Sequence, residues 1–571
     1  MAFDDASTRL APDDRVAAPG AATADGGTAG ARRRAAPPWL PAAVAVLAGL
    51  VSGRYRLGTP SPWRDEAATV DAAQRSVAQI FALLGHMDAV NGAYYLVIHP
   101  VIVIWGSSPT AIRAPSVLAM ALAAGFTAAL GRRLAAAAGL PSPAFTGLLA
   151  GLLLVAAPQA TKYAQEARAY GIVAMLATLA SYLLVRALAD DRWRWWAGYG
   201  TALACAGLFN LFCLLLIVAH GLSLLAPRAG PAATRPPGRQ LRRWAGAAGA
   251  ATAALMPLLV AGYRQRGQVA WLTRPGWGVV SAAVQGFAGS PAAVVPVALL
   301  ALAGAVAGLA PRRAAALTPG VIAVPWLAVP PVILLTISQA HPLFTWRYVE
   351  FSQPALALLC AAGLSWLAGL AARLPRPRLA HRLAWLPPVV IMVLLGVLLA
   401  GPQQAVRRPD ARLDSLRWAS TVLGRHELPG DAVFYLPSSR RILSMAYPGP
   451  WQRLRDVALA RSPRAAATLA GIEVSPAVLR QRFAGVRRVW LVTIRGLAQP
   501  PPDSRTDRAK IAMIRQLHLV GRWRAGAVVL RLYARSWPPR SARQISGLAA
   551  GGSTSARGLV PDETLYYRSS N

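Results

Sequence analysis

Residues 109–133 read PTAIRAPSVLAMALAAGFTAALGRR, an apolar stretch that is long enough to cross a membrane and that ends in two arginines. The same pattern recurs through the first 401 of the 571 residues. Eleven stretches fit it: 39–53, 109–130, 143–160, 168–188, 194–208, 211–226, 244–262, 290–310, 317–338, 351–371 and 383–401. The pattern predicts a polytopic α-helical membrane protein with about eleven transmembrane helices.

The composition excludes a purely soluble protein and a disordered one. Hydrophobic residues make up 55% of the chain and charged residues 15%, whereas a soluble domain has about 45–50% and about 25%. The net charge is +37, from 58 Arg and 2 Lys against 23 acids. Because the basic residues alternate with apolar stretches, they indicate membrane topology and contact with anionic membrane lipid, not a nucleic-acid partner. Abundant Arg, Ala, Gly and Pro indicate GC-rich coding, and we expect an actinobacterial source.

Arginine placement predicts the topology. With the N-terminus inside, sixteen arginines between residues 132 and 382 fall in connections on the cytoplasmic side. This requires that Tyr94–Gly106, which is 13 residues long and contains His99-Pro100, does not cross. We therefore expect an interfacial or re-entrant helix there. The protein is expected to be multi-pass in the cytoplasmic (plasma) membrane, with its site facing outside.

Acidic residues give an independent signal. Eight lie between residues 54 and 401, and six of them fall on the expected outer face. Only the Asp190-Asp191 pair lies inside. Carboxylates concentrated at helix ends on one face of a bundle indicate a site on that face.

The expected organisation has four parts. Residues 1–38 form a disordered cytoplasmic tail, and residues 39–401 form the transmembrane domain, with a long first outer loop at 54–108. Residues 402–535 form a small extracytoplasmic α/β domain, with strands at 431–437, 487–494 and 527–534 and helices at 410–425 and 507–518. Residues 536–571 form a disordered tail. The three cysteines lie in apolar segments and form no disulfide or zinc pattern.

The first outer loop carries two candidate motifs. SPWRDEAATV (61–70) places Asp65 and Glu66 just after the first span, where a desolvated carboxylate can act as a base, although a solvated helix cap is the simpler interpretation. HMDAVNGAYYLVIHP (86–100) brings together His86, Asp88 and Tyr94. An interfacial aromatic belt explains such tyrosines equally well, and the His86–Asp88 spacing does not form a metal pair on one helix face.

The later outer loops supply cations. TKYAQEARAYG (161–171) contains Lys162, Glu166, Arg168 and Tyr170, and HPLFTWRYVEFSQP (341–354) contains Arg347. Two cations with a carboxylate among apolar helices suit a phosphate and a sugar hydroxyl. An internal Glu166–Arg168 ion pair is the alternative.

These motifs, in their order, resemble the GT-C glycosyltransferases. WRDE, DAVNGAYYLVIHP, SSPTAIRAPSVLAM, GRRL, YAQEARAYG and RYVEFSQPALALLCAAGL together are similar to the dolichyl-phosphate-mannose-type and aminoarabinose-transferase-like branch, glycosyltransferase families 39 and 83. The resemblance covers roughly 60–370. It implies transfer of a sugar, mannose or similar, from a polyprenyl-phosphate donor to an acceptor hydroxyl on a protein, glycolipid or polysaccharide at the outer membrane face.

The resemblance also implies roles for particular residues. Asp65 matches the first-loop acid that serves as catalytic base, with Glu66 beside it in the motif, and Glu166 matches a site-lining residue of the second outer loop. We assign the donor phosphate to Lys162, Arg168 and Arg347, and the sugar or acceptor to Asp88, Glu166, His86, Tyr94 and Tyr170. No cofactor is certain, and a loosely held divalent cation (Mg, Mn or Zn) stays open because no closed ligand set exists. In-line displacement would invert the anomeric centre.

Two other functions stay open at this point. A lipid or envelope-polymer transporter or flippase also places polar residues among helices, but near mid-bilayer and often in paired repeats. A non-catalytic envelope scaffold is the other alternative. The acids at one face and the absence of a visible repeat favour the enzyme.

Overall fold

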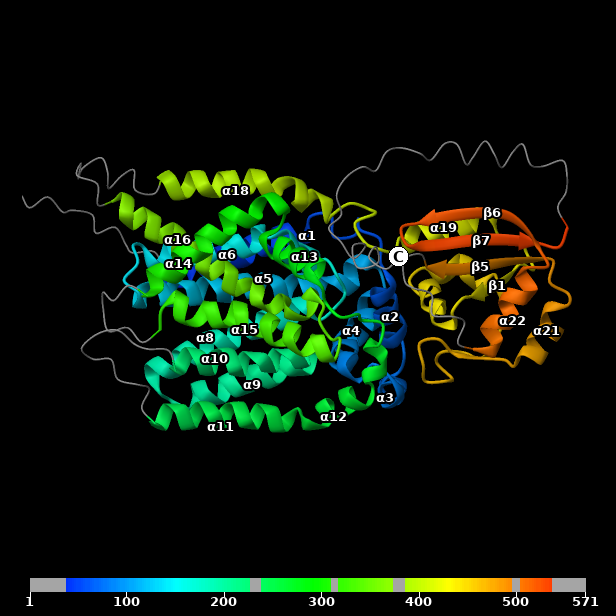
Figure 1. Cartoon of the computed structure of the whole chain (residues 1–571), viewed down its shortest axis with the longest axis horizontal. Coiled ribbons are helices and arrows are strands. Elements are labelled where there is room, and N and C mark those ends of the chain that lie inside the picture. Colours follow the sequence, from blue (N-terminus) through cyan, green and yellow to red (C-terminus); the bar gives the residue numbers. More distant parts are fainter. Residues whose placement is uncertain (1–36, 226–237, 310–316, 373–385, 495–503, 537–571) are drawn as a thin grey trace, which may run out of the picture. The chain divides into compact units, whose positions relative to one another are not determined.

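The computed structural model describes residues 37–225, 238–309, 317–372, 386–494 and 504–536. Each of the eleven expected spans coincides with a helix or with consecutive helices (Figure 1). They are α1 (Leu40–Arg54), α5 (Pro109–Ala137), α6 (Pro143–Ala156) with α7 (Pro158–Ala164), α8 (Tyr170–Asp190), α9 (Trp193–Phe209), η2 (Leu211–Leu214) with α10 (Leu215–Leu225), α11 (Gly238–Ala254) with α12 (Met256–Arg264), α13 (Trp277–Ala288) with η4 (Pro291–Ala293) and α14 (Val294–Leu309), α15 (Pro319–Ala340), η5 (Trp346–Ser352) with α16 (Gln353–Ala371), and α18 (Leu386–Ala405). The chain is a multi-pass membrane protein.

Length and hydropathy support fewer independent spans than eleven. Within the described ranges, five helices are long and apolar enough to cross a membrane, and three bent pairs raise the number to eight. The pairs α6–α7, α11–α12 and α13–α14 bend by 67°, 47° and 75°. Proline lies near each break, at Pro158, Pro257 and Pro291, where a missing N–H and a fixed φ interrupt the helix. The remaining three of the eleven expected spans correspond to α1, α9 and α10. These helices have 15, 17 and 11 residues, which is at or below the usual length of a membrane span.

Apolar side chains and small residues pack the bundle tightly. The largest buried cluster joins α5, α8, α9 and α16 through side chains such as Leu134, Leu184, Leu203 and Leu359. Helices α14 and α16 approach so closely at Gly363 that a β-carbon there would clash with the carbonyl oxygen of Leu300. Glycine is therefore required at this crossing.

The first outer loop folds into short helices: α2 (Arg64–Ala73), α3 (Val77–His86), η1 (Ala89–Asn91) and α4 (Gly92–Trp105). Helix α4 is the short apolar helix expected over Tyr94–Gly106. It packs on α2 through Tyr94 and Ile98, while Trp105 at its end is 68% exposed. The loop therefore forms a compact layer of helices against the bundle.

The C-terminal domain is a three-layer α/β unit. Its sheet has the order β2-β1-β5-β7-β6, with β1 parallel to β2 and β5, and β7 antiparallel to β5 and β6. The strands are β1 (Ala432–Tyr435), β2 (Arg455–Asp456), β5 (Arg488–Ile494), β6 (His518–Ala525) and β7 (Val528–Ala534), and β3 (Leu459–Arg461) pairs with β4 (Ile472–Glu473). Helix α19 (Leu416–His426) packs on one face of the sheet, and α21 (Pro476–Phe483) and α22 (Arg505–Ile514) pack on the other (Figure 1).

This arrangement confirms the small α/β domain expected from the sequence. The three expected strands correspond to β1, β5 and β7, and the expected helices to α19 and α22. The expected helix at 507–518 is too long, because α22 ends at Ile514 and β6 begins at His518. The disordered tails expected at 1–38 and 536–571 lie almost entirely outside the described residues.

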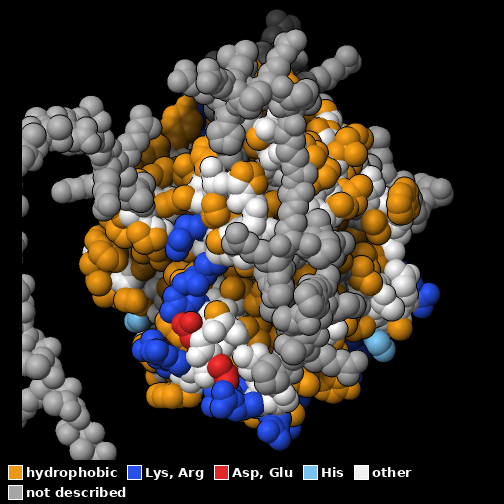
Figure 2. Space-filling model, turned by 90° about the vertical axis from the view of Figure 1, so that its left-hand side faces the viewer, with side chains coloured by type: hydrophobic (Ala, Val, Ile, Leu, Met, Phe, Trp, Pro, Cys, Tyr) orange, Lys and Arg blue, Asp and Glu red, His pale blue; other side chains and the backbone are white. Residues whose placement is uncertain are grey.

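Basic side chains gather at one end of the bundle. The described arginines at the ends of α5, α8, α9 and α11 are Arg132, Arg133, Arg186, Arg192, Arg194, Arg239, Arg242 and Arg243. Figure 2 faces this end and shows Lys and Arg side chains in a band beside hydrophobic ones, with few acids. Asp191 pairs there with Arg239 at 2.6 Å and with Arg243 at 3.0 Å. The other eight of the sixteen arginines lie outside the described residues.

Candidate functional site

A cavity of about 1160 Å³ lies where the connections at the other end of the bundle meet the C-terminal domain. Its walls come from α2, η1, the start of α8, the α9–η2 junction, the segments 259–273 and 337–348, and two segments of the C-terminal domain. Its charged and polar lining residues include Arg64, Asp65, Asp88, Asn91, Arg168, Tyr170, Asn210, Arg266, His341, Arg347, Tyr348, Ser439 and Arg440. The hollow therefore brings together polar residues from distant parts of the sequence.

Asp65 and Glu66 point in different directions from the first turn of α2. Trp63, in an extended conformation, caps the helix, so both acids lie in the turn where carboxylates are favoured. Asp65 lines the cavity, its side chain is 24% exposed, and Arg347 Nη1 lies 3.6 Å from Asp65 Oδ2. Only Asp65 of the pair is placed to meet a substrate.

Glu66 faces into the protein and is fully buried. Arg113 donates to both of its oxygens, at 2.7 and 2.8 Å, and the amide of Ala167 donates to Oε1 at 2.8 Å. Burial by itself would raise the pKa of Glu66, but Arg113 and the amide outweigh it and hold the pKa below its ordinary value. Glu66 therefore stays ionised and ties α2 to α5 and to the second outer loop.

The second outer loop repeats this division between a buried and a cavity-facing charge. Glu166 is 1% exposed, and Arg412 Nε lies 3.1 Å from its Oε1. Arg168, two residues later, lines the cavity and donates to Asn91 Oδ1 at 3.0 Å. Burial acts to lower the pKa of Arg168, but Asp65 and other nearby groups hold it above its ordinary value. Arg168 therefore provides a permanent positive charge in the cavity.

Arg412 reaches Glu166 from the segment that connects α18 to the C-terminal domain. Its Nη2 also donates to the carbonyl oxygens of Lys162 and Gln165, each at 3.3 Å. In the same segment, Arg407 donates to the carbonyl oxygen of Ser52 at 3.1 Å. These contacts join the second outer loop and α1 to the chain that leads into the C-terminal domain.

The structure places five of the ten sequence-predicted site residues in the cavity lining and five outside it. The lining residues are Asp65, Asp88, Arg168, Tyr170 and Arg347, and those outside are Glu66, His86, Tyr94, Lys162 and Glu166. Lys162 lies behind the cavity wall, with its Nζ 4.9 Å from the centre of the Trp346 ring. Tyr94 is buried, with its hydroxyl 3.2 Å from Ser116 Oγ.

Asp88 is held at the cavity edge by its neighbours. Tyr95 donates to Asp88 Oδ2 at 2.7 Å, and Asn91 Nδ2 to Oδ1 at 3.3 Å. His86, at the end of α3, directs its Nδ1 to the carbonyl oxygen of Ala82 at 2.9 Å. Among the described residues, no group of three or more His, Cys, Asp or Glu side chains could hold a metal ion. The cavity acids Asp65 and Asp88 therefore supply no closed set of ligands for a divalent ion.

Sequence reasoning missed several lining residues. Arg64 lines the cavity and its Nε lies 2.9 Å from Asp414 Oδ2. Asn210, at the break between α9 and η2, donates to the carbonyl oxygen of Tyr348 at 2.9 Å. Its position between two apolar stretches was the only signal for it. Ser439 and Arg440 carry no local motif, because only the tertiary fold brings them to the cavity.

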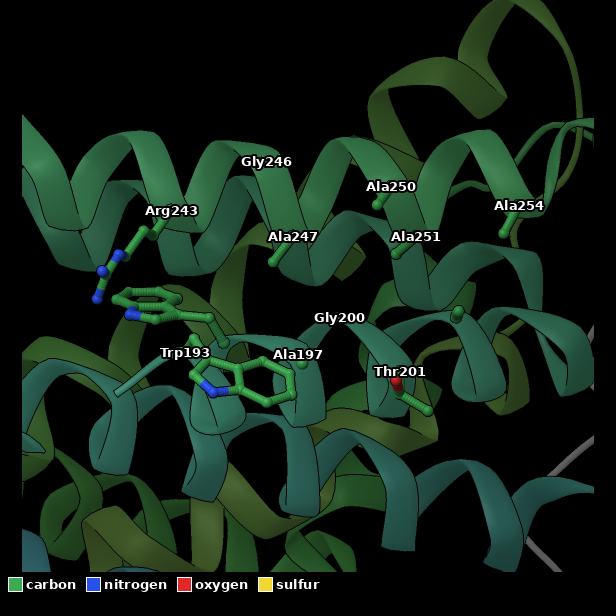
Figure 3. A pocket seen from close by; sticks show the side chains of 12 residues that line it. Trp193, Ala197, Gly200, Thr201, Arg243, Gly246, Ala247, Ala250, Ala251 and Ala254 are labelled. Atoms are coloured by element: carbon green, nitrogen blue, oxygen red, sulfur yellow. The ribbon is translucent and has the colours of Figure 1, made fainter. Parts of the chain in front are cut away.

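A second hollow, of about 520 Å³, lies between α9 and α11 (Figure 3). Alanine and glycine line most of it, with Trp193 and Arg243 at one end. Arg243 is the one charged residue of its lining, and this side chain pairs with Asp191. The lining of this hollow contains no acidic side chain that could act as a base, so the larger cavity is the candidate active site.

Part of the sequence and the fold as a whole are similar to known proteins. A family model described as dolichyl-phosphate-mannose-protein mannosyltransferase matches residues 93–237. None of the curated proteins matches the sequence significantly. Among solved structures, ArnT from Cupriavidus metallidurans bound to undecaprenyl phosphate matches with a TM-score of 0.53 and 15% identity, covering 87% of this chain and 98% of that chain.

Two further structures are similar. ArnT in the apo state gives a TM-score of 0.51 at 14% identity, with the same coverage of 87% and 98%. AglB, the oligosaccharyltransferase of Archaeoglobus fulgidus in complex with an inhibitory peptide and a dolichol-phosphate, gives 0.46 at 10% identity, covering 88% of this chain and 75% of that chain. The ArnT matches establish the fold, and the resemblance to GT-C proteins read from the sequence motifs is confirmed.

Proposed function

We infer that this chain is a membrane glycosyltransferase of the GT-C class, which moves a sugar from a polyprenyl-phosphate donor to an acceptor hydroxyl. The observation that carries the inference is a carboxylate, Asp65, in a large cavity beside two arginines, Arg168 and Arg347. This is the minimal set that the reaction needs: a base for the hydroxyl and positive charge for a phosphate leaving group. The ArnT-like fold and the family match support the same reaction.

The donor phosphate is assigned to Arg168 and Arg347. Both line the cavity. Guanidinium groups bind phosphate through two parallel hydrogen bonds. Lys162 adds positive charge from behind Trp346. Tyr170 and Asp88 are the cavity groups available to sugar or acceptor hydroxyls.

The chemical step follows from these positions. The Asp65 carboxylate accepts the proton of the acceptor hydroxyl as its oxygen forms a bond to the anomeric carbon. On the opposite side the bond from that carbon to the phosphate oxygen breaks, and its electron pair stays on the phosphate. Arg168 and Arg347 stabilise the charge that develops there. Because attack and departure are in line, the product has the inverted anomeric configuration.

We further propose the orientation and the sugar. The arginine-rich end of the bundle faces the cytoplasm, as the bias of basic residues to the cytoplasmic side favours, so the cavity and the C-terminal domain face outside the plasma membrane. Mannose is the first sugar to test, because the matching family is described as using dolichyl-phosphate mannose. The acceptor is a protein, a glycolipid or a polysaccharide.

The test uses purified protein, radiolabelled polyprenyl-phosphate mannose and a membrane extract. Wild-type protein is expected to move label into a new product, and Asp65→Asn to lose at least about a hundredfold of the rate. Asp410→Asn, which changes an exposed aspartate in the same way, serves as the control. Wild-type rates in Asp65→Asn would refute the assignment of the base. Failure of every polyprenyl-phosphate sugar would favour the transporter or scaffold instead.

A further inference from the structure

The hollow between α9 and α11 has exposed residues along its whole length. They recur at every fourth position of each helix: Trp193, Ala197 and Thr201 on α9, and Gly246, Ala250 and Ala254 on α11. Residues four apart lie on the same face of a helix, so the two rows form the rims of one groove. Gly200 and Ala251 are buried between them. The groove is therefore open on the surface of the bundle.

This groove is as long as one leaflet of a bilayer is thick. Its lining runs from Trp193 to Ala204 on α9 and from Arg243 to Ala254 on α11, which is eleven steps on each helix (204 minus 193 and 254 minus 243). Eleven steps of about 1.5 Å give a length of about 16 Å. The hydrocarbon core of a bilayer is about 30 Å thick, so one leaflet contributes about 15 Å. The length suits an acyl chain that lies along the groove.

The lining is apolar except at one end. Alanine, glycine and tryptophan form all of it apart from Thr201 and Arg243. Figure 3 shows Arg243 beside Trp193 at one end, while Ala250, Ala251 and Ala254 lie toward the other. A molecule that fills this groove therefore has an apolar chain and a charged or polar group at one end.

Arginines surround the end of the groove where Arg243 lies. Among the described residues, the ends of α8, α9 and α11 carry six arginines there against two acids: Arg186, Arg192, Arg194, Arg239, Arg242 and Arg243 against Asp190 and Asp191. Arg186 pairs with Asp190 at 3.0 Å, and Asp191 pairs with both Arg239 and Arg243. Both acids are thus matched within this set, and the formal charge of the set is +4 (6 minus 2). An anionic group is favoured at this end.

Arg243 joins this positive charge to the groove. Its side chain is 34% exposed. Within the described part of the chain, its side chain donates through Nη1, to Asp191 Oδ1 at 3.0 Å and to the carbonyl oxygen of Asp191. A guanidinium has five N–H donors in a planar fork, so Nε and Nη2 can still donate to an oxyanion. Asp191 also accepts from Nε1 of Trp196, another lining residue, at 3.0 Å, which holds Arg243 in place beside the groove.

We propose that the groove binds an anionic phospholipid of the leaflet at the arginine-rich end of the bundle. One acyl chain lies between α9 and α11, and the phosphate accepts hydrogen bonds from Arg243. Basic pockets between transmembrane helices are known to bind anionic lipid headgroups. A polyprenyl-phosphate donor needs its phosphate in the candidate active site, which lies at the other end of the bundle. The proposal therefore does not depend on the glycosyltransferase function.

The experiment compares an anionic and a zwitterionic phospholipid with identical acyl chains. Detergent-purified protein is titrated with phosphatidylglycerol or phosphatidylcholine, and bound lipid is measured by native mass spectrometry. Arg243→Gln removes the charge that contacts the headgroup, and Ala250→Phe fills the groove. Arg132→Gln, at the same end of the bundle on α5, and Ala253→Phe, exposed on α11, lie outside the lining and are the controls. Unfolding in SDS checks that each variant is folded.

Wild type is expected to bind phosphatidylglycerol more tightly than phosphatidylcholine. Arg243→Gln should weaken phosphatidylglycerol binding about fivefold, the factor for one arginine near an anionic lipid surface, and should leave phosphatidylcholine binding unchanged. Ala250→Phe should weaken the binding of both lipids, and the two controls should match wild type. Equal affinity of wild type for the two lipids, or wild-type binding in Ala250→Phe, would overturn the proposal. Displacement of phosphatidylglycerol by an equimolar amount of undecaprenyl phosphate would also overturn it, because the groove would then belong to the donor.

Discussion

Arg412 offers the sharpest test of how the site is built. The variant Arg412→Met removes the contact with Glu166 at 3.1 Å and three hydrogen bonds to carbonyl oxygens at 3.3 Å. Glu166, which is 1% exposed in the wild-type protein, loses this cation. Removing one partner of a buried ion pair costs about 3–5 kcal/mol. We expect that loss in the free energy of unfolding.

A double variant distinguishes charge from packing. Arg412→Met with Glu166→Gln leaves neither charge of this pair, and its cost should fall to about 2 kcal/mol, which reflects the lost hydrogen bonds from Arg412 to carbonyl oxygens. The double variant should therefore be more stable than Arg412→Met by about 1–3 kcal/mol.

The assay is unfolding of the detergent-solubilised protein by SDS, followed by tryptophan fluorescence, with the transfer rate measured in parallel. Arg408→Met, at an exposed arginine of the same segment, is the control and should resemble wild type. Because Arg168 lies two residues from Glu166, the single variant should also lower kcat, and the double variant should restore part of it. Equal stabilities of the single and double variants would refute the reasoning.

Two further predictions follow from buried contacts elsewhere. Arg113 holds the pKa of Glu66 below its ordinary value despite burial. The ionised Glu66 therefore stabilises the folded protein above the unfolded-state pKa, and this stabilisation is lost as the pH falls through the folded-state pKa. Between about pH 7 and about pH 4, the free energy of unfolding in SDS should fall less for Glu66→Gln than for wild type. Gly363→Ala should lower the free energy of unfolding by about 1–3 kcal/mol, because its β-carbon would meet the α14 backbone. Gly396→Ala, with open space around it, is the control and should change this free energy little. Equal effects of the two substitutions would contradict the close helix crossing.

The sequence was informative where the signal is local. Apolar length and arginine position located the helices, and short β-branched stretches located β1, β5 and β7. Asp65 was found because its motif follows the first span. The lengths of the helices were less predictable, since the breaks before Pro158 and before Met256 divide the expected spans 143–160 and 244–262.

Side-chain direction was the part that local sequence could not supply. Asp65 and Glu66 look equivalent in a motif, yet one lines the cavity and the other meets Arg113, which lies 47 residues later. Glu166 and Arg168 suggested a local ion pair, but Glu166 pairs with Arg412, which lies 246 positions further on (412 minus 166). Such choices depend on contacts between distant segments, which a single sequence does not reveal.

The same division recurs around the cavity and explains how the site stays rigid. Three short stretches each place one charge in the cavity and a second in a buried network: Asp65 with Glu66, Arg168 with Glu166, and Arg440 with Arg441. The buried member fixes the backbone through partners on other elements, so its exposed neighbour is positioned without ordering by the substrate. Since burying unpaired charge costs several kcal/mol, each network forms only when the distant segments are in place. The Glu66 network closes among the outer loops and α5, and the Arg441 network closes within the C-terminal domain. Only the Glu166 network depends on the segment that enters the C-terminal domain, so we expect the position of Arg168 to depend on Arg412.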